Sequence, residues 1–275
     1  MKYFLILALF TFSSYAQTPY TKGAKESDFQ GYKRYDFRLG KHKCYVIEPK
    51  KSTKGKPWVW RARFDSRSNS DFDLAMLKEG FHVAQVGVGG LLGGPQAMRN
   101  FDEFYAYLTE KCGFGKRPVL EGLSRGGLPI FNWSIQNPDK VSCVYADNAV
   151  CDFKSWPGGK GKGKYSEKLW KAVQKNYGFK SEKEAIEYKR NPIDLVHILA
   201  ENGVRVMLGL AMKDSVVPAE ENGLIIEKRY NAALKKGDIK VLVLKNENAG
   251  HHPHGFKDPS GLVEFAKKAV ADLSR

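Results

Sequence analysis

A serine framed by glycines is the residue of this chain best suited to covalent chemistry. It is Ser124, in the run Gly122-Leu123-Ser124-Arg125-Gly126-Gly127, and residues 117–121 predict a buried strand before it and residues 128–136 a helix after it. Glycines at such a turn let neighbouring backbone approach, and the helix points its free N–H groups and positive dipole end at the serine. The pattern predicts a nucleophile on a sharp turn, although by itself it also fits an ordinary glycine-rich turn.

A serine nucleophile needs a base within hydrogen-bonding distance, and the base needs an acid that fixes its tautomer. In a sheet with parallel strands, both should come from loops at the carboxyl ends of later strands. Asp214 follows the predicted strand 204–210, and His251 follows the last predicted strand. Ser124, Asp214 and His251 are therefore the candidate catalytic residues.

Two alternatives stay open for these partners. Asp147 directly follows the predicted strand 141–146 and is a second candidate acid, while His252 or His254 is a second candidate base. The three histidines also suggest a metal cluster, but at most one residue separates neighbours and no matching carboxylate motif is present. We expect neither a metal nor a cofactor.

The order of nucleophile, acid and histidine, each after a predicted strand, resembles the α/β-hydrolase superfamily. The resemblance covers roughly residues 30–270 and implies a serine hydrolase with a mostly parallel, doubly wound sheet. More narrowly, the runs PWVWRARF, GLSRGG, CDFKSWPGGKGKG and GHHPHGF resemble secreted bacterial hydrolases of a prolyl-oligopeptidase-like or acetyl-xylan-esterase-like branch. Many members of those groups are thought to act on plant or algal glycans.

The resemblance also implies an oxyanion hole, in which backbone N–H groups stabilise the charge that develops on the substrate oxygen. The N–H of Arg125, which follows the nucleophile, is one expected donor. The second is expected from Arg63 or Phe64, after the predicted strand 57–64. The chain departs from the superfamily here, because no HGGG-type run occurs at that point.

Several side chains near these loops are suited to contact a substrate: Arg61, Arg63, Arg125, Trp156 and His252. Guanidinium groups bind carboxylates and sugar hydroxyls through paired donors, and an indole ring stacks on a sugar face. The alternative is structural, with arginines paired to buried acids such as Glu121 and Trp156 anchoring its loop.

Strands alternate with helices along most of the chain, which predicts the α/β class and a mostly parallel sheet covered on both faces. We expect strands at 32–38, 41–47, 57–64, 81–88, 117–121, 141–146, 204–210 and 239–244, and helices at 71–78, 98–108, 128–136, 193–201, 218–236 and 260–273. Residues 17–31 indicate a flexible lead. Residues 150–192 break the alternation just after a strand, which predicts a cap or lid insertion over the active face.

The first sixteen residues have the features of a secretory signal peptide. Lys2 precedes an apolar run at 4–12 that is too short to cross a bilayer, and Ser14-Tyr15-Ala16 offers small residues at the recognition positions. We expect cleavage after Ala16, a hydrolase domain over 17–275, a secreted or periplasmic location and no membrane span.

The net charge of the chain indicates which binding partners it favours, and its cysteines indicate whether disulfides are expected. The formal charge of +15 favours an anionic partner, which outside the cytoplasm means acidic polysaccharide rather than nucleic acid, although a basic surface without a partner is equally compatible. Four cysteines in an oxidising compartment make a disulfide plausible. Cys143 and Cys151 are the expected pair, with free buried thiols as the alternative.

Together these features predict a secreted serine carboxylesterase that removes ester substituents from a carbohydrate. One alternative is a prolyl-oligopeptidase-like serine peptidase. The other is a catalytically silent hydrolase fold that binds acidic glycans.

Overall fold

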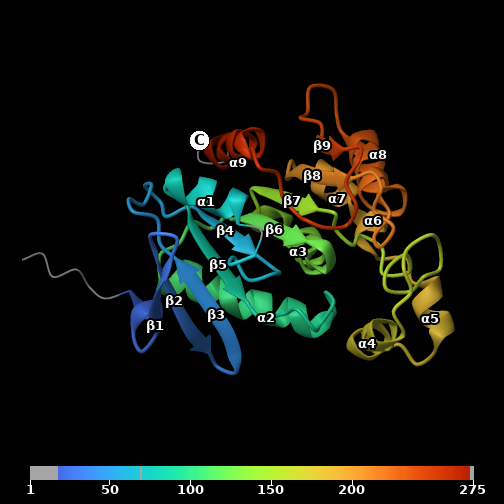
Figure 1. The fold of residues 1–275 in the computed structure, drawn as a ribbon, viewed down its shortest axis with the longest axis horizontal. Helices are drawn as coiled ribbons and strands as arrows, with labels where there is room; N and C mark the ends of the chain where they lie inside the picture. Colours follow the sequence, from blue (N-terminus) through green and yellow to red (C-terminus); the bar gives the residue numbers. More distant parts are fainter. Residues whose placement is uncertain (1–17, 69, 273–275) are drawn as a thin grey trace, which may run out of the picture.

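The computed structural model describes residues 18–68 and 70–272, so the predicted signal peptide lies outside the described residues. Within them, nine strands form one sheet in the order β1-β2-β3-β5-β4-β6-β7-β8-β9 (Figure 1). The pairs from β1 to β5 are antiparallel, and all pairs from β5 to β9 are parallel. The predicted α/β class and mostly parallel sheet are confirmed.

The strands are β1 Lys25–Phe29, β2 Tyr32–Leu39, β3 His42–Ile47, β4 Trp58–Arg61, β5 His82–Val86, β6 Val119–Leu123, β7 Cys143–Asp147, β8 Arg205–Ala211 and β9 Leu242–Asn246. The helices are α1 Asp71–Lys78, α2 Pro95–Ala106, α3 Gly127–Gln136, α4 Glu167–Tyr177, α5 Glu182–Glu187, α6 Pro192–Leu195, α7 His197–Glu201, α8 Gly223–Ala233 and α9 Ser260–Asp272. None of these helices is long and apolar enough to span a bilayer.

Two sequence predictions about elements were wrong in part. The expected flexible lead contains β1, which pairs with β2 through a tight turn where Gln30 has φ 50° and Gly31 has φ 84°. The strand KESDF is polar because it lies at the edge of the sheet, so it lacks the apolar alternation that identifies inner strands. The expected helix at 193–201 is two short helices, α6 and α7.

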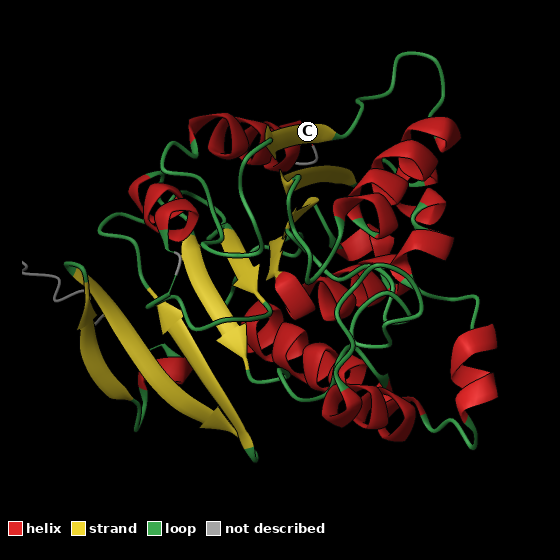
Figure 2. Ribbon diagram, turned by 45° about the vertical axis from the view of Figure 1, so that its right-hand side comes forward, coloured by secondary structure: helices red, strands yellow, loops and turns green. Residues whose placement is uncertain are grey.

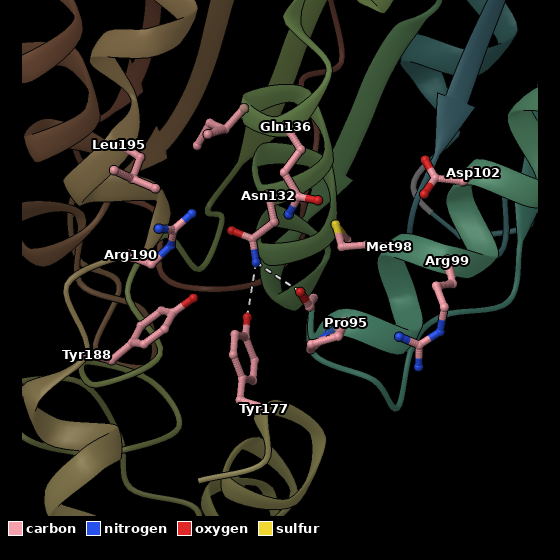
Figure 3. A pocket seen from close by; sticks show the side chains of 12 residues that line it. Pro95, Met98, Arg99, Asp102, Asn132, Gln136, Tyr177, Tyr188, Arg190 and Leu195 are labelled. Atoms are coloured by element: carbon pink, nitrogen blue, oxygen red, sulfur yellow. Dashed lines mark hydrogen bonds between the residues drawn. The ribbon is translucent and has the colours of Figure 1, made fainter.

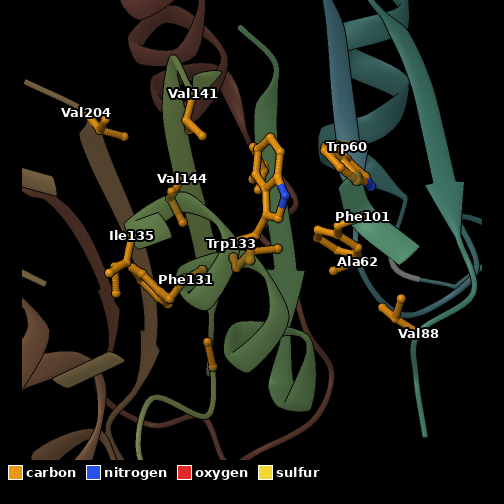
Figure 4. Close-up of a cluster of buried hydrophobic side chains, with 14 of the residues drawn as sticks. Trp60, Ala62, Val88, Phe101, Phe131, Trp133, Ile135, Val141, Val144 and Val204 are labelled. Atoms are coloured by element: carbon orange, nitrogen blue, oxygen red, sulfur yellow. The ribbon is translucent and has the colours of Figure 1, made fainter. Parts of the chain in front are cut away.

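Helices cover both faces of the sheet (Figure 2). On one face α2, α3 and α6 to α8 pack on a core that includes Trp60, Phe101 and Trp133, and their aromatic rings lie together (Figure 4). On the other face α1 and α9 bury a smaller cluster, which includes Val59 of β4. Successive side chains of a strand point to opposite faces, so the sequence of β4 places its tryptophans on one face and Val59 with Arg61 on the other.

The predicted Cys143–Cys151 disulfide is wrong. All four cysteines are buried as free thiols. Cys143 packs in the cluster under α1 and α9, whereas Cys151 packs in the cluster on the opposite face of the sheet. The sheet therefore lies between the two sulfur atoms that sequence proximity had paired.

Residues 150–192 contain α4 and α5 and bury a cluster around Phe153 and Trp170, which Leu92, Leu128 and Val217 join from outside the segment. The segment contacts loops at the carboxyl edge of the sheet: Asn176 Nδ2 donates to Gly90 O at 2.9 Å, and Lys164 N donates to Val216 O at 3.1 Å. A cavity of about 350 Å³ lies where the segment meets α2 and α3, and Asn132 bridges it with a 3.0 Å hydrogen bond to Tyr177 (Figure 3).

Arg61 is a fully buried cation near the centre of the sheet, with no exposed surface. Its guanidinium contacts Asp73 of α1 at 2.9 Å and Glu121 of β6 at 3.0 Å. It also donates to the carbonyl oxygens of Phe64 at 2.7 Å and Ser68 at 2.8 Å. One side chain thus joins β4, β6, α1 and the loop that follows β4.

Burial raises the pKa of Glu121 well above its ordinary value, and the negative charge of Asp73 and a hydrogen bond with it raise that pKa further. A protonated Glu121 can donate to Asp73, which supplies a partner for the otherwise unpartnered Oε2 of Glu121 and Oδ1 of Asp73. The site then holds one positive and one negative charge, and the desolvation cost of a third charge is avoided.

Replacement of Arg61 and of Glu121 should therefore have very different effects on stability. We expect Arg61→Met to lower the free energy of unfolding by about 3–5 kcal/mol, because it leaves a buried carboxylate and two carbonyls without their donor. Glu121→Gln should cost less than about 1 kcal/mol, because an amide has the shape and charge of the protonated acid. Urea denaturation of both variants measures the difference.

The pH dependence of the free energy of unfolding tests independently whether Glu121 is protonated. The unfolded chain releases the Glu121 proton near its ordinary pKa of 4.5, whereas the folded chain keeps it to higher pH. The free energy of unfolding of the unmodified protein should therefore fall as the pH rises from about 4.5 through the raised pKa of Glu121. In Glu121→Gln the contribution of this group to the pH dependence should be absent. A loss as large as that of Arg61→Met at every pH would show that Glu121 is ionised.

Candidate active site

Ser124 stands on a sharp turn between β6 and α3, with φ of 50° and 6% of its surface exposed. The turn is possible because of its glycines. A Cβ added at Gly122 would lie 2.5 Å from the carbonyl oxygen of Gly126, and one added at Gly126 would lie 3.2 Å from Cβ of Arg63. The backbone bends so tightly that only glycine fits at position 122 and a side chain at 126 would crowd Arg63, and the hydroxyl projects at the carboxyl edge of the sheet.

The structure brings the three candidate catalytic side chains together. Ser124 Oγ lies 2.9 Å from His251 Nε2, and His251 Nδ1 lies 2.6 Å from Asp214 Oδ2. A carboxylate only accepts hydrogen bonds, so the proton of the neutral imidazole resides on Nδ1. That tautomer leaves Nε2 free to accept the proton of the serine hydroxyl.

Asp214 is held by the loop that follows β8. Its Oδ1 accepts hydrogen bonds from the backbone N–H groups of Val216 and Val217, both at 2.8 Å, and its side chain is 1% exposed. These two amides fix the plane of the carboxylate and direct Oδ2 to His251. The acid is therefore oriented by backbone that belongs to its own turn.

The alternative acid and one alternative base form a second pair beside the first. Asp147, at the carboxyl end of β7, lies 2.7 Å from His254 Nδ1 through its Oδ1. Its Oδ2 accepts from Tyr145 Oη at 3.1 Å and from Gly255 N at 3.2 Å. Asp147 therefore fixes the loop that carries the histidines, and not the imidazole that contacts Ser124.

His252 is exposed, and its ring centre lies 4.7 Å from that of His251 and 4.8 Å from that of His254. Burial and the two neighbouring imidazoles lower its pKa. Nitrogen atoms of the three rings lie within 4.8 Å of one another, but both ring nitrogens of His251 already contact protein groups. His252 and Nε2 of His254 remain uncommitted, which is fewer donors than a zinc site takes.

The loop after β4 lies against the serine turn, as a second oxyanion donor requires. The backbone N and O of Arg63 would lie 3.6 and 3.4 Å from a Cβ at Gly126. The carbonyl oxygen of Phe64 accepts from Arg61 and from Gln85, each at 2.7 Å, which fixes this loop. The backbone N–H groups of Arg125, Arg63 and Phe64 stay the predicted donors.

Two of the predicted substrate contacts are wrong. Arg61 points to the α1 face of the sheet and is fully buried in its ion pairs, so no substrate reaches it. Trp156 is 9% exposed and packs in the cluster with Leu128, Phe153 and Trp170, where it anchors its loop. None of the predicted site residues lines the cavity of Figure 3.

Asn148 is a site residue that the sequence did not reveal. It has φ of 43°, its Oδ1 accepts from Ala211 N at 2.7 Å, and its Nδ2 donates to the carbonyl oxygen of His251 at 3.4 Å. It links the end of β8 to the histidine loop. The step Asp147-Asn148 directly after a buried strand was the available signal, since these residues favour turns and left-handed backbone.

No protein-family model and no curated protein matches the sequence. Solved structures do match. Puromycin hydrolase is 17% identical with a TM-score of 0.59, over 82% of this chain and 36% of its own, so this chain spans about a third of that protein. Acetyl xylan esterase 1 from Thermoanaerobacterium sp. JW/SL YS485 is 16% identical with a TM-score of 0.56, over 92% of this chain and 87% of its own.

Est1E from Butyrivibrio proteoclasticus is 14% identical with a TM-score of 0.57, over 90% of this chain and 99% of its own. Identities this low carry information about the fold alone. Together with the parallel sheet from β5 to β9 and the serine turn after β6, they show that the chain has the α/β-hydrolase fold.

Proposed function

We propose that the chain is a secreted serine hydrolase, and most simply a carboxylesterase that removes acyl or methyl ester groups from a carbohydrate. The observation that carries the proposal is the hydrogen-bonded series Ser124 Oγ, His251 and Asp214, with contacts of 2.9 and 2.6 Å. A similar structure that covers most of both chains is named an acetyl xylan esterase, so this fold at this chain length is compatible with ester hydrolysis.

In this mechanism Ser124 Oγ attacks the ester carbonyl while His251 Nε2 accepts its proton. The oxygen of the tetrahedral intermediate is stabilised by the N–H of Arg125 and one from the loop after β4. The C–O bond to the alcohol breaks as His251 returns the proton to the leaving oxygen. Water, deprotonated by the same imidazole, then attacks the acyl-enzyme, releases the acid and restores the hydroxyl of Ser124.

Replacement of the nucleophile tests the proposal directly. Ser124→Ala should lower turnover of p-nitrophenyl acetate by about 10⁴-fold or more, because no covalent intermediate can form. A fluorophosphonate probe should label the unmodified protein and not this variant. Equal rates in the two proteins would remove Ser124 from the mechanism, and absence of both label and turnover in the unmodified protein would favour the silent, glycan-binding alternative.

The two acids provide a matched pair of variants. Asp214→Asn should lower kcat by about 10⁴-fold, because an amide no longer fixes the proton on Nδ1 of His251. Asp147→Asn should cost less than about tenfold, because it orients a different histidine. The same p-nitrophenyl acetate assay measures both, and a reversed order of effects would assign the catalytic acid to Asp147.

A peptidase is the second candidate function, because puromycin hydrolase and dipeptidyl peptidase 4 from Porphyromonas gingivalis are among the similar structures. This chain spans only about a third of each, so their activities do not transfer to it. Hydrolysis of proline-linked peptides with esters left intact would favour this candidate.

Export is proposed from the sequence alone. Expression of the full chain with a Sec pathway present should yield a mature protein that begins at Gln17, because Ser14 and Ala16 are the small residues that signal peptidase recognises. Amino-terminal sequencing of extracellular or periplasmic protein measures this. An intact Met1 on active protein in the cytoplasm would contradict it.

A further inference from the structure

Two arginines next to the serine turn have no acidic partner. Arg125 directly follows Ser124, and Arg63 lies across the turn, with its Cβ beside Gly126. Both side chains are partly buried, and no carboxylate within residues 18–68 and 70–272 forms an ion pair with either. Burial lowers the pKa of both, and the charge of Arg125 lowers that of Arg63 further, so the two cations are near enough to repel.

The chain treats its other buried arginines differently. Arg34 forms ion pairs with Asp36 at 2.8 Å and Asp65 at 2.7 Å, and Arg61 pairs with Asp73 and Glu121. Each of these guanidinium groups has two acidic side chains as partners and at least one negative charge beside it, as burial of a charge requires. Among the described residues Arg63 has no such carboxylate partner, and its Nε is buried without a hydrogen-bond partner.

Packing and a cation–π contact, and no ion pair with any described residue, hold the Arg63 side chain in place. Its guanidinium lies over Gly89, where an added Cβ would come within 2.9 Å of Cζ, and Cζ lies 4.9 Å from the centre of the Phe64 ring. The Gly89 loop is in turn fixed to α4, since Asn176 donates to the carbonyl oxygen of Gly90. Arg63 therefore extends from the serine turn to the Gly89 loop, which contacts the segment 150–192.

We propose that Arg63 and Arg125 form a subsite for an anionic group, a carboxylate or sulfate, carried by the same sugar as the ester that Ser124 attacks. The subsite rests on the proposed esterase function and names its substrate class. Planar guanidinium forks bind such groups bidentately, and partial burial strengthens the attraction. The formal charge of +15 also attracts an acidic polysaccharide to the surface from a distance.

Three substrates that differ at one position test the subsite: acetylated methyl glucuronoside, acetylated methyl glucoside 6-sulfate and the neutral acetylated methyl glucoside. The unmodified protein should favour at least one anionic sugar by about 10- to 100-fold in kcat/KM, which is the range of a charge-assisted hydrogen-bonded pair. The glucuronoside and the sulfate separate the two anions. Equal kcat/KM values on all three sugars would overturn the subsite.

Charge-neutral variants assign the preference to these residues. Arg63→Gln and Arg125→Gln should each reduce the ratio of anionic to neutral kcat/KM toward one, and Arg63→Lys should keep part of it. Arg117→Gln is the control, because it removes the same charge from an exposed position before β6, at the opposite edge of the sheet. Equal losses on neutral and anionic sugars would instead show a role in the oxyanion hole or in folding.

A binding measurement separates the subsite from the hydrolase proposal. Ser124→Ala titrated with methyl glucuronoside and glucoside 6-sulfate should show saturable binding of an anionic sugar that methyl glucoside lacks, and the added Arg63→Gln change should abolish it. Binding without any ester hydrolysis by the unmodified protein would reject the esterase and retain the subsite. Ester hydrolysis without anion binding and without a preference for anionic sugars would reject the subsite and retain the esterase.

Discussion

The burial of the Arg61 guanidinium constrains most of the region around Ser124. A charge with no exposed surface has to be surrounded by acceptors, and here they come from α1, from β6 and from two carbonyls of the loop after β4. Because β6 leads directly into Ser124 and the loop carries Arg63 and Phe64, Arg61 fixes the nucleophile turn and the predicted oxyanion donors relative to each other. Arg61, which the sequence predicts as a substrate contact, instead connects the elements behind the active site.

Two acids from neighbouring strands hold the histidine loop, and each contacts a different histidine. Asp214 after β8 contacts the imidazole at Ser124, and Asp147 at the end of β7 contacts His254 three residues further along. The second pair is buried and receives additional hydrogen bonds from Tyr145 and Gly255. A long loop between β9 and α9 thereby keeps one imidazole in a fixed place, which catalysis by proton transfer requires.

Local sequence predicted much of this arrangement. The order of strands and helices, the glycine turn and the acid and histidine after later strands all follow from patterns within about ten residues. The polar edge strand β1 and the pairing of Asp147 with His254 depend on contacts between distant segments, which no local pattern contains. The position of Arg61 was predictable, because alternation with Trp58 and Trp60 in β4 directs it away from their face.

The four buried thiols have a consequence for how the molecule can be observed. Burial raises the pKa of Cys44 and Cys143 to about 12, and raises those of Cys112 and Cys151 as well. The thiolate is the nucleophile that attacks an alkylating reagent, so the native molecule is protected twice, by lack of access and by lack of ionisation. Cys143 and Cys151 lie on opposite sides of the sheet. The order in which these native cysteines are alkylated during unfolding therefore reports which layer of helices detaches first.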